Sequence, residues 1–427
     1  MKTTVIVGSG FSGLMVAVNL VRQDYAGRVV LVEKRPVVAQ GAAYSTAFPG
    51  HLLNVPAFGM SAYPDEPDHF KTWAVARGFR EDAFVPRCLY GEYLKEQFTA
   101  RRDRLEVVSA EAVRVETGQL YLDDGQTLAW DHLVLALGNF PPQRLKIPCD
   151  SGFYDSSYFQ QDPWDSTARP PVQSVLLIGT GLTAVDKVLE LAESTREIYA
   201  ISRHGLRPKA HPNPPLRLSP EQAIRLDPSQ GSLSLLRQFR AEVRRTGDWR
   251  FTIASLRAAT NPIWQGLSEP EKMRFRRHLG SLWDNHRHQI PWEVSDHLSR
   301  LQNLHFLAGR LHQFQQVQNR VRVSYAGGQL EVDRVINCTG PSGNLKQVDS
   351  PLLADLLHRG LGSLNPSQLG LATNSDFRLL DSDGQASSNI FTLGPLLKGT
   401  LGETIAVPEI REQAVRVAAG ILCGGDR

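Results

Sequence analysis

Apolar runs of two kinds alternate along this 427-residue chain, and their order predicts its secondary structure. Residues 3–7 and 29–32 are short apolar runs that read as buried strands, and residues 14–21 between them read as an apolar helix. A strand, a helix and a strand in this order predict a parallel α/β unit. The same order returns near the middle of the chain, at residues 174–178, 185–191 and 198–201.

Each α/β unit continues with short strands that turn residues separate. We expect a small β-meander in each half, followed by an apolar strand that ends in glycine. The first half has its strands at 105–108, 112–115, 120–122, 127–130 and 132–137, and the second at 304–307, 320–325, 329–332 and 335–338. An internal repeat of this kind is more specific than any one of its motifs. A further strand at 389–393 precedes a helix expected from residue 403 to about 422.

A glycine turn joins the first strand to the first helix. Gly8 allows a tight turn, Gly10 lets the backbone approach a pyrophosphate, and Gly13 lets helix and strand pack closely. The free N–H groups of the helix N-terminus favour the pyrophosphate. Glu33, which ends the second strand, can accept a hydrogen bond from a ribose 2′-hydroxyl and would repel a 2′-phosphate, so FAD or NAD is expected here. The cofactor-binding candidates of this turn are Gly8, Gly10, Phe11, Ser12, Gly13, Glu33 and Lys34.

A second glycine turn opens the second unit, and the strand after it ends differently. Where the first half has Glu33, the second has Ser202 and Arg203. A guanidinium at this place would pair with a 2′-phosphate, so NADPH is the expected ligand. The alternative is that Arg203 is only a surface residue. The candidates here are Gly179, Gly181, Leu182, Thr183, Ser202 and Arg203.

These motifs predict an α/β fold with two Rossmann-like three-layer dinucleotide-binding domains, each with a small β-meander, plus a helical insertion. We expect a discontinuous FAD-binding domain, residues 1–145 and 334–427, and an NAD(P)H-binding domain, residues 146–333. The N-terminus of the last helix could face the pyrimidine edge of the flavin. Further cofactor-binding candidates in the first domain are Asn54, Val113, Gly138, Gly340, Gly394, Pro395, Thr404 and Ile405.

The insertion, at about 211–300, is rich in Arg, Trp and Pro and has helical apolar spacing. We expect most of its tryptophans, residues 249, 264, 283 and 292, to be core residues. The functional alternative is a substrate cap. Between Arg237 and Arg300, eleven Arg and one Lys stand against seven acids, a balance of +5. Solvated helix faces or an anion-steering surface would each explain this excess.

The loop from Gly41 to Pro67 is long for a compact domain, and its apolar and aromatic content favours an ordered loop over the cofactor. Asn54 is the candidate for a polar contact near the flavin ring, with His51 and Arg87 as the other candidate catalytic residues. A structural role is the alternative for His51, because it lies in an apolar loop.

The composition is that of an ordinary globular protein, with 41% hydrophobic and 21% charged residues. A net charge of +3 indicates no special affinity for nucleic acid. The four cysteines lie far apart, without the spacing of a zinc site or a redox-active pair, so no metal is expected and a reducing, cytoplasmic setting fits. We expect neither a signal peptide nor a membrane span.

The whole chain resembles the flavoproteins with two dinucleotide-binding domains, and more narrowly the bacterial FAD/NAD(P)-binding proteins. The likeness rests on residues 8–13, 41–46, 51–57 with 60–61, 86–94 and 202–206. These proteins are in turn similar to the class B flavin monooxygenases, especially the N-hydroxylating enzymes. The Phe-x-Gly-x-x-x-His-x-x-x-Trp fingerprint of Baeyer–Villiger enzymes is absent, and Pro341 stands where N-hydroxylases usually have an aromatic residue.

The resemblance implies an FAD-dependent, NADPH-using oxidoreductase. The first hypothesis is a monooxygenase that acts on a small nitrogen- or sulfur-containing molecule through a C4a-hydroperoxyflavin, with molecular oxygen as a second substrate. The alternatives are an NADPH-dependent reductase or dehydrogenase without oxygenation, and a non-catalytic flavin-binding or sensor protein. The sequence leaves the substrate and the oligomeric state open.

Overall fold

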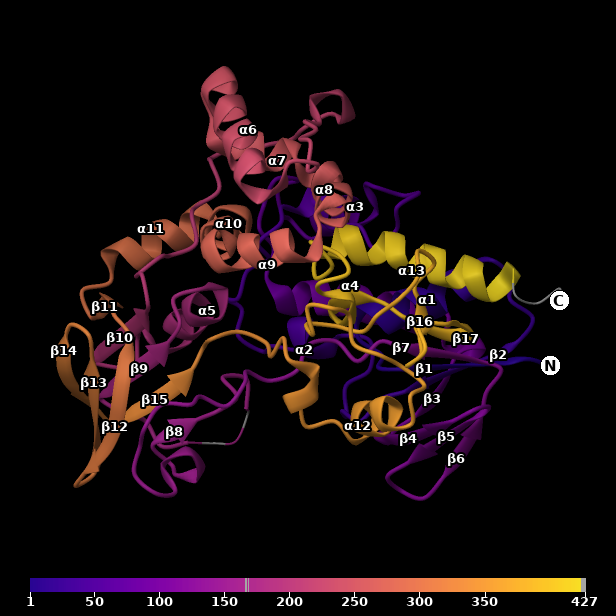
Figure 1. The fold of residues 1–427 in the computed structure, drawn as a ribbon, viewed down its shortest axis with the longest axis horizontal. Helices are drawn as coiled ribbons and strands as arrows, with labels where there is room; N and C mark the ends of the chain where they lie inside the picture. The colour runs from indigo at the N-terminus through magenta and orange to yellow at the C-terminus, as the bar shows by residue number, and fades with distance from the viewer. Residues whose placement is uncertain (166, 168, 424–427) are drawn as a thin grey trace.

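The computed structural model describes residues 1–165, 167 and 169–423. Two parallel sheets lie side by side, and a group of helices covers the junction between them from above (Figure 1). Each sheet carries helices on one face and a three-stranded antiparallel meander on the other. The predicted fold class, two Rossmann-like three-layer units with a helical insertion, is confirmed.

The first sheet has six strands in the order β16-β17-β7-β1-β2-β3. It is parallel except for β16, which pairs antiparallel with β17. Its central strands are apolar on both faces, as a sheet covered on both sides requires. The strands are β1 (Thr3–Val7), β2 (Arg28–Val32), β3 (Glu106–Val108), β7 (His132–Leu135), β16 (Arg378–Leu380) and β17 (Ala386–Thr392).

One face of this sheet packs against helices and the other against the first meander. Ile6, Leu31 and Phe391 point into the helical layer, while Val5 and Leu133 point into the meander layer. The helices are α1 (Phe11–Arg22), α2 (Gly41–Tyr44), α3 (His69–Val75), α4 (Arg87–Thr99) and α13 (Val407–Cys423). The opposite layer contains β4 (Ala112–Glu116), β5 (Gln119–Leu122), β6 (Thr127–Ala129) and α12 (Pro351–His358).

The second sheet has five parallel strands in the order β11-β10-β9-β15-β8. These are β8 (Phe159–Gln160), β9 (Ser174–Ile178), β10 (Glu197–Ser202), β11 (Leu304–Ala308) and β15 (Arg334–Asn337). Helix α5 (Leu182–Leu191) packs on one face, where Val175 and Ile198 contact Ala184 and Val188. The second meander, β12 (Leu311–Val317), β13 (Arg320–Tyr325) and β14 (Gly328–Val332), covers the other face.

Two predicted meander strands belong to the parallel sheets instead. β3 pairs with β2, and β11 pairs with β10, each as the edge strand next to the second strand of its unit. Sequence spacing could not separate them from the meanders, because a short apolar strand before a turn looks the same in both places. The domain limits stay a prediction. Because β15 pairs with β9 and β8, we propose to move the limit from residue 334 to after residue 337.

The insertion is helical, as predicted, but its tryptophans are not core residues. Trp249, Trp264 and Trp283 are only partly buried, and Trp292 is 37% exposed. Its helices are α6 (Gly231–Thr246), α7 (Trp249–Ser255), α8 (Thr260–Gly266), α9 (Glu269–His278), α10 (Gly280–Arg287) and α11 (Trp292–Arg300). Within the described residues, no helix is long and apolar enough to cross a bilayer.

Candidate functional site

The first glycine turn brings β1, α1 and β7 into very close contact. Gly8 has a φ of +98°, and a Cβ placed on it would lie 2.3 Å from the carbonyl oxygen of Ala136. A Cβ on Gly13 would lie 1.9 Å from the carbonyl oxygen of Gly8. Only glycine fits at either place, so the start of α1 stands directly over the end of β1. Its free N–H groups face the place that a dinucleotide pyrophosphate takes in this kind of unit.

Glu33 holds the turn from the end of β2. Its carboxylate is 5% exposed and accepts hydrogen bonds from the backbone N–H of Ser9 (3.0 Å), the hydroxyl of Ser9 (2.7 Å) and the backbone N–H of Arg35 (3.0 Å). Both hydrogen bonds from Ser9 go to Oε2, and Oε1 receives only Arg35. A carboxylate oxygen accepts more than one hydrogen bond, so Oε1 has capacity for a ribose hydroxyl.

A cleft runs along this turn, and it gathers residues from distant parts of the chain. Its lining includes the ion pair between Lys34 and Glu111 (2.8 Å), and also Ile405 and Ile410, around the start of α13. Of the predicted cofactor-binding residues, the cleft brings together Gly8, Gly10, Phe11, Ser12, Glu33, Lys34, Gly138, Pro395 and Ile405. Sequence reasoning did not single out Arg35, Gln40, Leu137, Asn139, Phe140, Ser350 and Leu352, which also line it.

Some predicted residues do not line the cleft but lie next to residues that do. The backbone N–H of Gly394 donates to Gln413 Oε1 (2.8 Å), and the hydroxyl of Thr404 donates to the carbonyl oxygen of Gly394 (2.7 Å). These bonds hold the segment before α13 in place. The segment lies directly against the first glycine turn, because a Cβ on Gly394 would lie only 2.6 Å from the hydroxyl oxygen of Ser12. Val113 and Gly340 are not among the residues that line the cleft. The adjacent Ala110, Glu111 and Ala112 line it in place of Val113.

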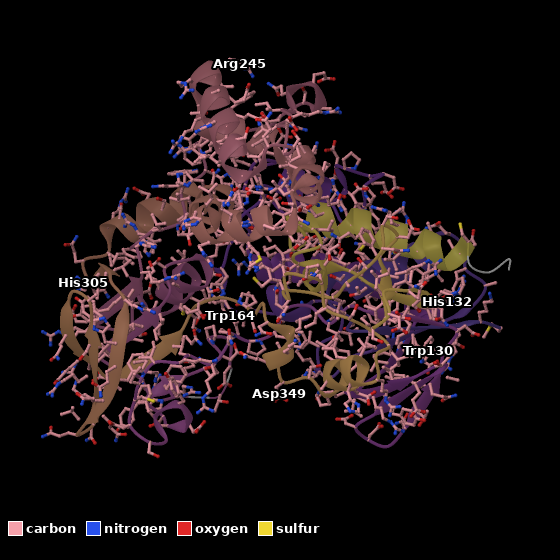
Figure 2. The ribbon with its side chains drawn as sticks, viewed as in Figure 1. Trp130, His132, Trp164, Arg245, His305 and Asp349 are labelled. Carbon is pink, nitrogen blue, oxygen red and sulfur yellow. The ribbon has the colours of Figure 1, made fainter. Side chains whose placement is uncertain are left out.

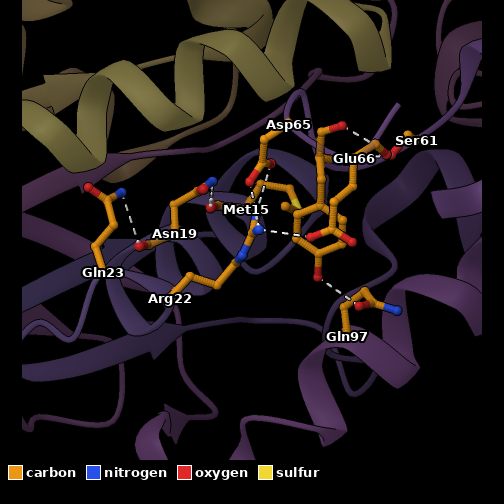
Figure 3. A network of polar contacts seen from close by, with 9 residues as sticks. Met15, Asn19, Arg22, Gln23, Ser61, Asp65, Glu66 and Gln97 are labelled. Atoms are coloured by element: carbon orange, nitrogen blue, oxygen red, sulfur yellow. Dashed lines mark hydrogen bonds and ion pairs between the residues drawn. The ribbon is translucent and has the colours of Figure 1, made fainter. Parts of the chain in front are cut away.

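Polar contacts hold the loop after Gly41 against α1 (Figure 3), and its position over the cofactor stays a prediction. The Arg22 guanidinium binds both carboxylate oxygens of Asp65 (3.1 and 2.7 Å) and one of Glu66 (2.8 Å), and it stacks 4.5 Å from the centre of the Tyr63 ring. The Tyr63 hydroxyl donates to Gln97 of α4 (2.7 Å). Residues Gly41 to Tyr44 of the same loop line the cleft.

The second glycine turn has the same backbone conformation, but it is less crowded where α5 begins. Gly179 has a φ of +114°, and a Cβ on it would lie 2.3 Å from the carbonyl oxygen of Cys338. By contrast, no atom lies within 4 Å of a Cβ on Gly181, which caps α5. The hydroxyl of Ser202 accepts a hydrogen bond from Thr180 (2.9 Å). Arg203 is exposed, and no residue in the described part of the chain forms a hydrogen bond or ion pair with its guanidinium.

The three candidate catalytic residues do not meet in the cleft. His51 and Arg87 contact α5 of the second unit: the imidazole Nε2 lies 3.1 Å from Glu190, and the guanidinium lies 2.8 Å from Asp186. Asn54 contributes its backbone carbonyl, which accepts a hydrogen bond from His211 of the insertion (3.0 Å). All three therefore lie at contacts between units, and a catalytic role for them stays a prediction.

The part of the chain that is described contains neither a disulfide nor a cluster of side chains that could bind a metal. All four cysteines are free, and burial raises the pKa of the Cys338 thiol well above its usual range. No group of three or more His, Cys, Asp or Glu side chains there could hold a metal ion.

Residues 5–140, which contain the first turn, Glu33 and the loop over α1, match a protein-family model described as FAD-NAD(P)-binding. The match extends over this segment and not over the whole chain. The predicted resemblance to FAD/NAD(P)-binding proteins is thereby confirmed. The cofactors predicted from the sequence, FAD and NADPH, agree with this family.

Two curated relatives match larger parts of the chain. The uncharacterized protein YdhS of Escherichia coli is 24% identical over 68% of this chain, and a Baeyer–Villiger monooxygenase of Stachybotrys chlorohalonatus is 26% identical over 47% of it. The chain spans 65% of the length of the first relative and 33% of the second.

Solved structures share the architecture of the whole chain. An ornithine N-hydroxylase of Kutzneria sp. superposes with a TM-score of 0.65 at 14% identity, covering 98% of each chain. The ornithine hydroxylase of Pseudomonas aeruginosa gives 0.64 at 14% identity, covering 99% of each. A thioredoxin reductase of Lactococcus lactis gives 0.56 at 12% identity, again covering 99% of each. At these identities the likeness shows the fold of the chain and nothing finer.

Proposed function

We propose that the protein is an FAD-dependent oxidoreductase that uses NADPH, and specifically a monooxygenase of a small nitrogen- or sulfur-containing molecule. The observation that carries the proposal is the pair of glycine turns. Both have the same backbone conformation, but the second strand of each unit is followed by a different side chain, Glu33 in the first unit and Arg203 in the second. One turn suits a dinucleotide without a 2′-phosphate, and the other suits a dinucleotide that has one.

The residues of the first unit fit FAD. When bound, this cofactor accepts a hydride and passes electrons or oxygen to a second substrate. Gly10 lines the cleft at the start of α1, where free N–H groups would receive the pyrophosphate, and Glu33 would receive a ribose hydroxyl on Oε1. Pro395 and Ile405, which also line the cleft, would lie beside the flavin ring and keep water away from it.

The second unit would hold NADPH. Gly181 leaves room for the pyrophosphate at the start of α5, and the exposed Arg203 would receive the 2′-phosphate. A planar guanidinium binds a phosphate through two parallel hydrogen bonds, which a lysine could not do. We assign no step to a nucleophilic side chain, because this reaction requires the protein mainly to position its cofactors and substrate.

Two similarities favour oxygenation over plain reduction. The ornithine hydroxylases superpose over nearly the full length of the chain, and one curated relative is a Baeyer–Villiger monooxygenase. The disulfide reductase alternative has less support, since the cysteines of this chain are free and far apart in the sequence. An NADPH-dependent reductase without oxygenation, and a flavin-binding sensor, are kept as outcomes of the test.

Anaerobic mixing of the FAD-loaded protein with NADPH, followed by addition of oxygen and candidate amines or thioethers, tests this function. A monooxygenase will bleach the flavin within seconds and form about one oxygenated product per NADPH consumed. Bleaching with release of hydrogen peroxide alone, for every substrate tried, would identify a reductase. No bleaching by NADPH or NADH would leave only the sensor.

Substituting Arg203 tests the choice of nucleotide. Arg203→Ala should weaken NADPH binding by about tenfold to a hundredfold, which is the contribution of one to two charge-assisted hydrogen bonds. The affinity for NADH should be almost unchanged. The matched control is Arg196→Ala, in the same unit but before β10. Equal weakening of both nucleotides by Arg203→Ala would contradict the phosphate assignment.

A further inference from the structure

A polar cluster joins the two dinucleotide units, and its members come from both. His51 and Arg87 belong to the first unit, and Asp186 and Glu190 lie one turn apart on α5 of the second. Arg87 donates to Asp186 Oδ2 (2.8 Å), and its Nε donates to the carbonyl oxygen of Leu52 (3.1 Å). His51 Nε2 lies 3.1 Å from Glu190 and 3.2 Å from the carbonyl oxygen of Asp186, while its Nδ1 lies 2.8 Å from the hydroxyl of Thr46.

These contacts are buried and nearly balanced in charge. His51 is 0% exposed, the Asp186 side chain 8% and the Arg87 side chain 19%. Burial raises the pKa of Asp186, against the opposing effect of Arg87. Burial also acts to raise the pKa of Glu190, but hydrogen bonds from His51 and Lys187 lower it overall. Two acids thus face Arg87 and Lys187, and each partner is costly to remove, because a lone buried charge would be left.

Apolar contacts surround the cluster and make the junction continuous. Val185 of α5 forms a small buried core with Ile290 and Val294, and Leu52 of the first unit packs against this core together with Leu182 and Leu189 of α5. The indole of Trp164, labelled near the middle of Figure 2, meets the His51 ring edge-on with 5.6 Å between ring centres. The junction therefore has both an apolar core and directional polar contacts.

Each side of the junction leads directly to one nucleotide site. On the second unit, Asp186 lies one turn after Gly181 and Leu182, where α5 begins and would receive a pyrophosphate. On the first unit, Arg87 begins α4, and Gly91 one turn later packs against the carbonyl oxygen of Tyr44, a residue that lines the cleft. A rotation of α5 against α4 would thus move one site relative to the other.

We propose that His51, Arg87, Asp186 and Glu190 form an interdomain clamp that holds the NADPH unit at the angle at which hydride passes to the flavin. The proposal rests on the function proposed above, and it makes His51 and Arg87 positioning residues that touch neither cofactor. Hydride transfer needs the reacting atoms about 3–3.5 Å apart, and an error of 1 Å can cost about a hundredfold in rate.

The test compares Arg87→Met, Arg87→Lys and Asp186→Asn with the wild type. We expect FAD and NADPH affinities to change less than about threefold, because neither side chain lines a nucleotide site. The rate of flavin reduction by saturating NADPH in a single anaerobic turnover should fall about tenfold or more in Arg87→Met and Asp186→Asn. Arg87→Lys keeps the charge but loses the bond to Leu52, so it should show a smaller loss. Reduction by dithionite, which needs no nucleotide, should be unchanged in all.

A matched control and a second readout keep the clamp testable on its own. Arg144→Met removes an exposed ion pair with Asp155 (3.2 Å) and should change neither rate. Small-angle X-ray scattering of the FAD-loaded proteins should show a larger radius of gyration for Arg87→Met than for wild type and control. Unchanged scattering together with an unchanged reduction rate would overturn the clamp. If wild type is not reduced by NADPH, the proposed function fails, and scattering alone then decides on the clamp.

Discussion

At the scale of single residues, Glu33 illustrates how one side chain shapes a turn and selects a ligand. Its carboxylate binds Ser9 through two hydrogen bonds, and Ser9 lies between the glycines that open the cleft. The acid is therefore needed for the turn before any ribose is present. This double use explains why a charged group can be 95% buried here, since a buried carboxylate is stable only when its oxygens are hydrogen-bonded.

Replacing Glu33 by Gln should weaken FAD binding and the fold together. The amide cannot accept all the hydrogen bonds that the carboxylate receives, so we expect a loss of about 1–3 kcal/mol in unfolding free energy and at least about a tenfold weaker FAD complex. Urea unfolding and flavin titration measure the two effects. Glu106→Gln is the control, because Glu106 pairs with Arg28 (2.6 Å) at the surface of the same sheet and should cost less than about 1 kcal/mol.

His211 should make stability depend on pH. Burial lowers the pKa of His211 to about 4, and the nearby Arg287 and Arg250 act in the same direction. The unfolded chain takes up a proton at this histidine below about pH 6.5, but the folded protein does so only near pH 4. Stability is therefore present above pH 6.5 and is lost as the pH falls from about 6.5 to about 4.

His211→Gln should flatten this dependence, because glutamine can still donate to the carbonyl oxygen of Asn54 but does not titrate in this range. Unfolding free energies from urea titrations at pH 7 and pH 5 should differ by about 1–2 kcal/mol less in the variant than in the wild type. The exposed His204→Gln serves as the control. An identical pH dependence in all three proteins would show that His211 is not held neutral.

At the scale of elements, the two glycine turns look alike in sequence but should respond differently to alanine. Gly13 faces the carbonyl oxygen of Gly8 at a distance that no side chain allows, whereas a Cβ at Gly181 would meet no atom within 4 Å. Gly13 thus serves the packing of α1 on β1. Gly181 has no such neighbour, so its role is to leave space for a ligand.

Gly13→Ala should destabilise the protein by about 1–3 kcal/mol or more, because α1 must move away from β1. Gly181→Ala should change the unfolding free energy by less than about 0.5 kcal/mol. It should nevertheless weaken NADPH binding by about tenfold, because the added methyl group blocks the approach of the pyrophosphate. Thermal unfolding and nucleotide titration on both variants separate these effects. A normal NADPH affinity in Gly181→Ala would argue that the second turn binds no nucleotide.

The elements that sequence predicted well are those with a strong local signal. The glycine turns, the apolar strands and the helix α1 follow from the spacing of residues alone. The sequence did not show that Ser350 and Leu352 reach the cleft. The spacing of Leu352, Leu353 and Leu356 is helical, but spacing alone does not show which distant segment a helix packs against. The sequence analysis also missed the clamp, although Asp186 and Glu190 four residues apart inside an apolar helix were a usable sign.

At the scale of the whole molecule, two ion pairs join the insertion to the first turn of α13 and to the segment before it. Arg287 binds both carboxylate oxygens of Glu403 at 2.5 Å, and Arg257 binds those of Glu409 at 2.8 and 3.1 Å. The Glu403 side chain is 7% exposed. Because Ile405 of this segment lines the cleft, the insertion sets the position of one wall of the proposed flavin site.

Glu403→Gln should loosen the insertion, because it leaves the Arg287 guanidinium without its counter-ion. Breaking such a buried pair costs about 3–5 kcal/mol. Hydrogen exchange should become faster in α8 and α10 while the two sheets stay protected. The control is Arg245→Met, which removes an exposed pair with Glu242 (2.7 Å) at the tip of the insertion, labelled in Figure 2. Equal protection in both variants would show that the pair between Arg287 and Glu403 does not hold the insertion in place.

The pairing of β17 with β7 has a consequence for the order of folding. Thr392 of β17 bonds to the carbonyl oxygen of Leu135, 257 residues earlier, so the first sheet has an open edge at β7 until β17 has been made. All five strands of the second sheet lie between residues 159 and 337. On the ribosome the second unit can therefore close before the first, and the exposed edge of β7 is where a nascent chain would be most exposed to aggregation.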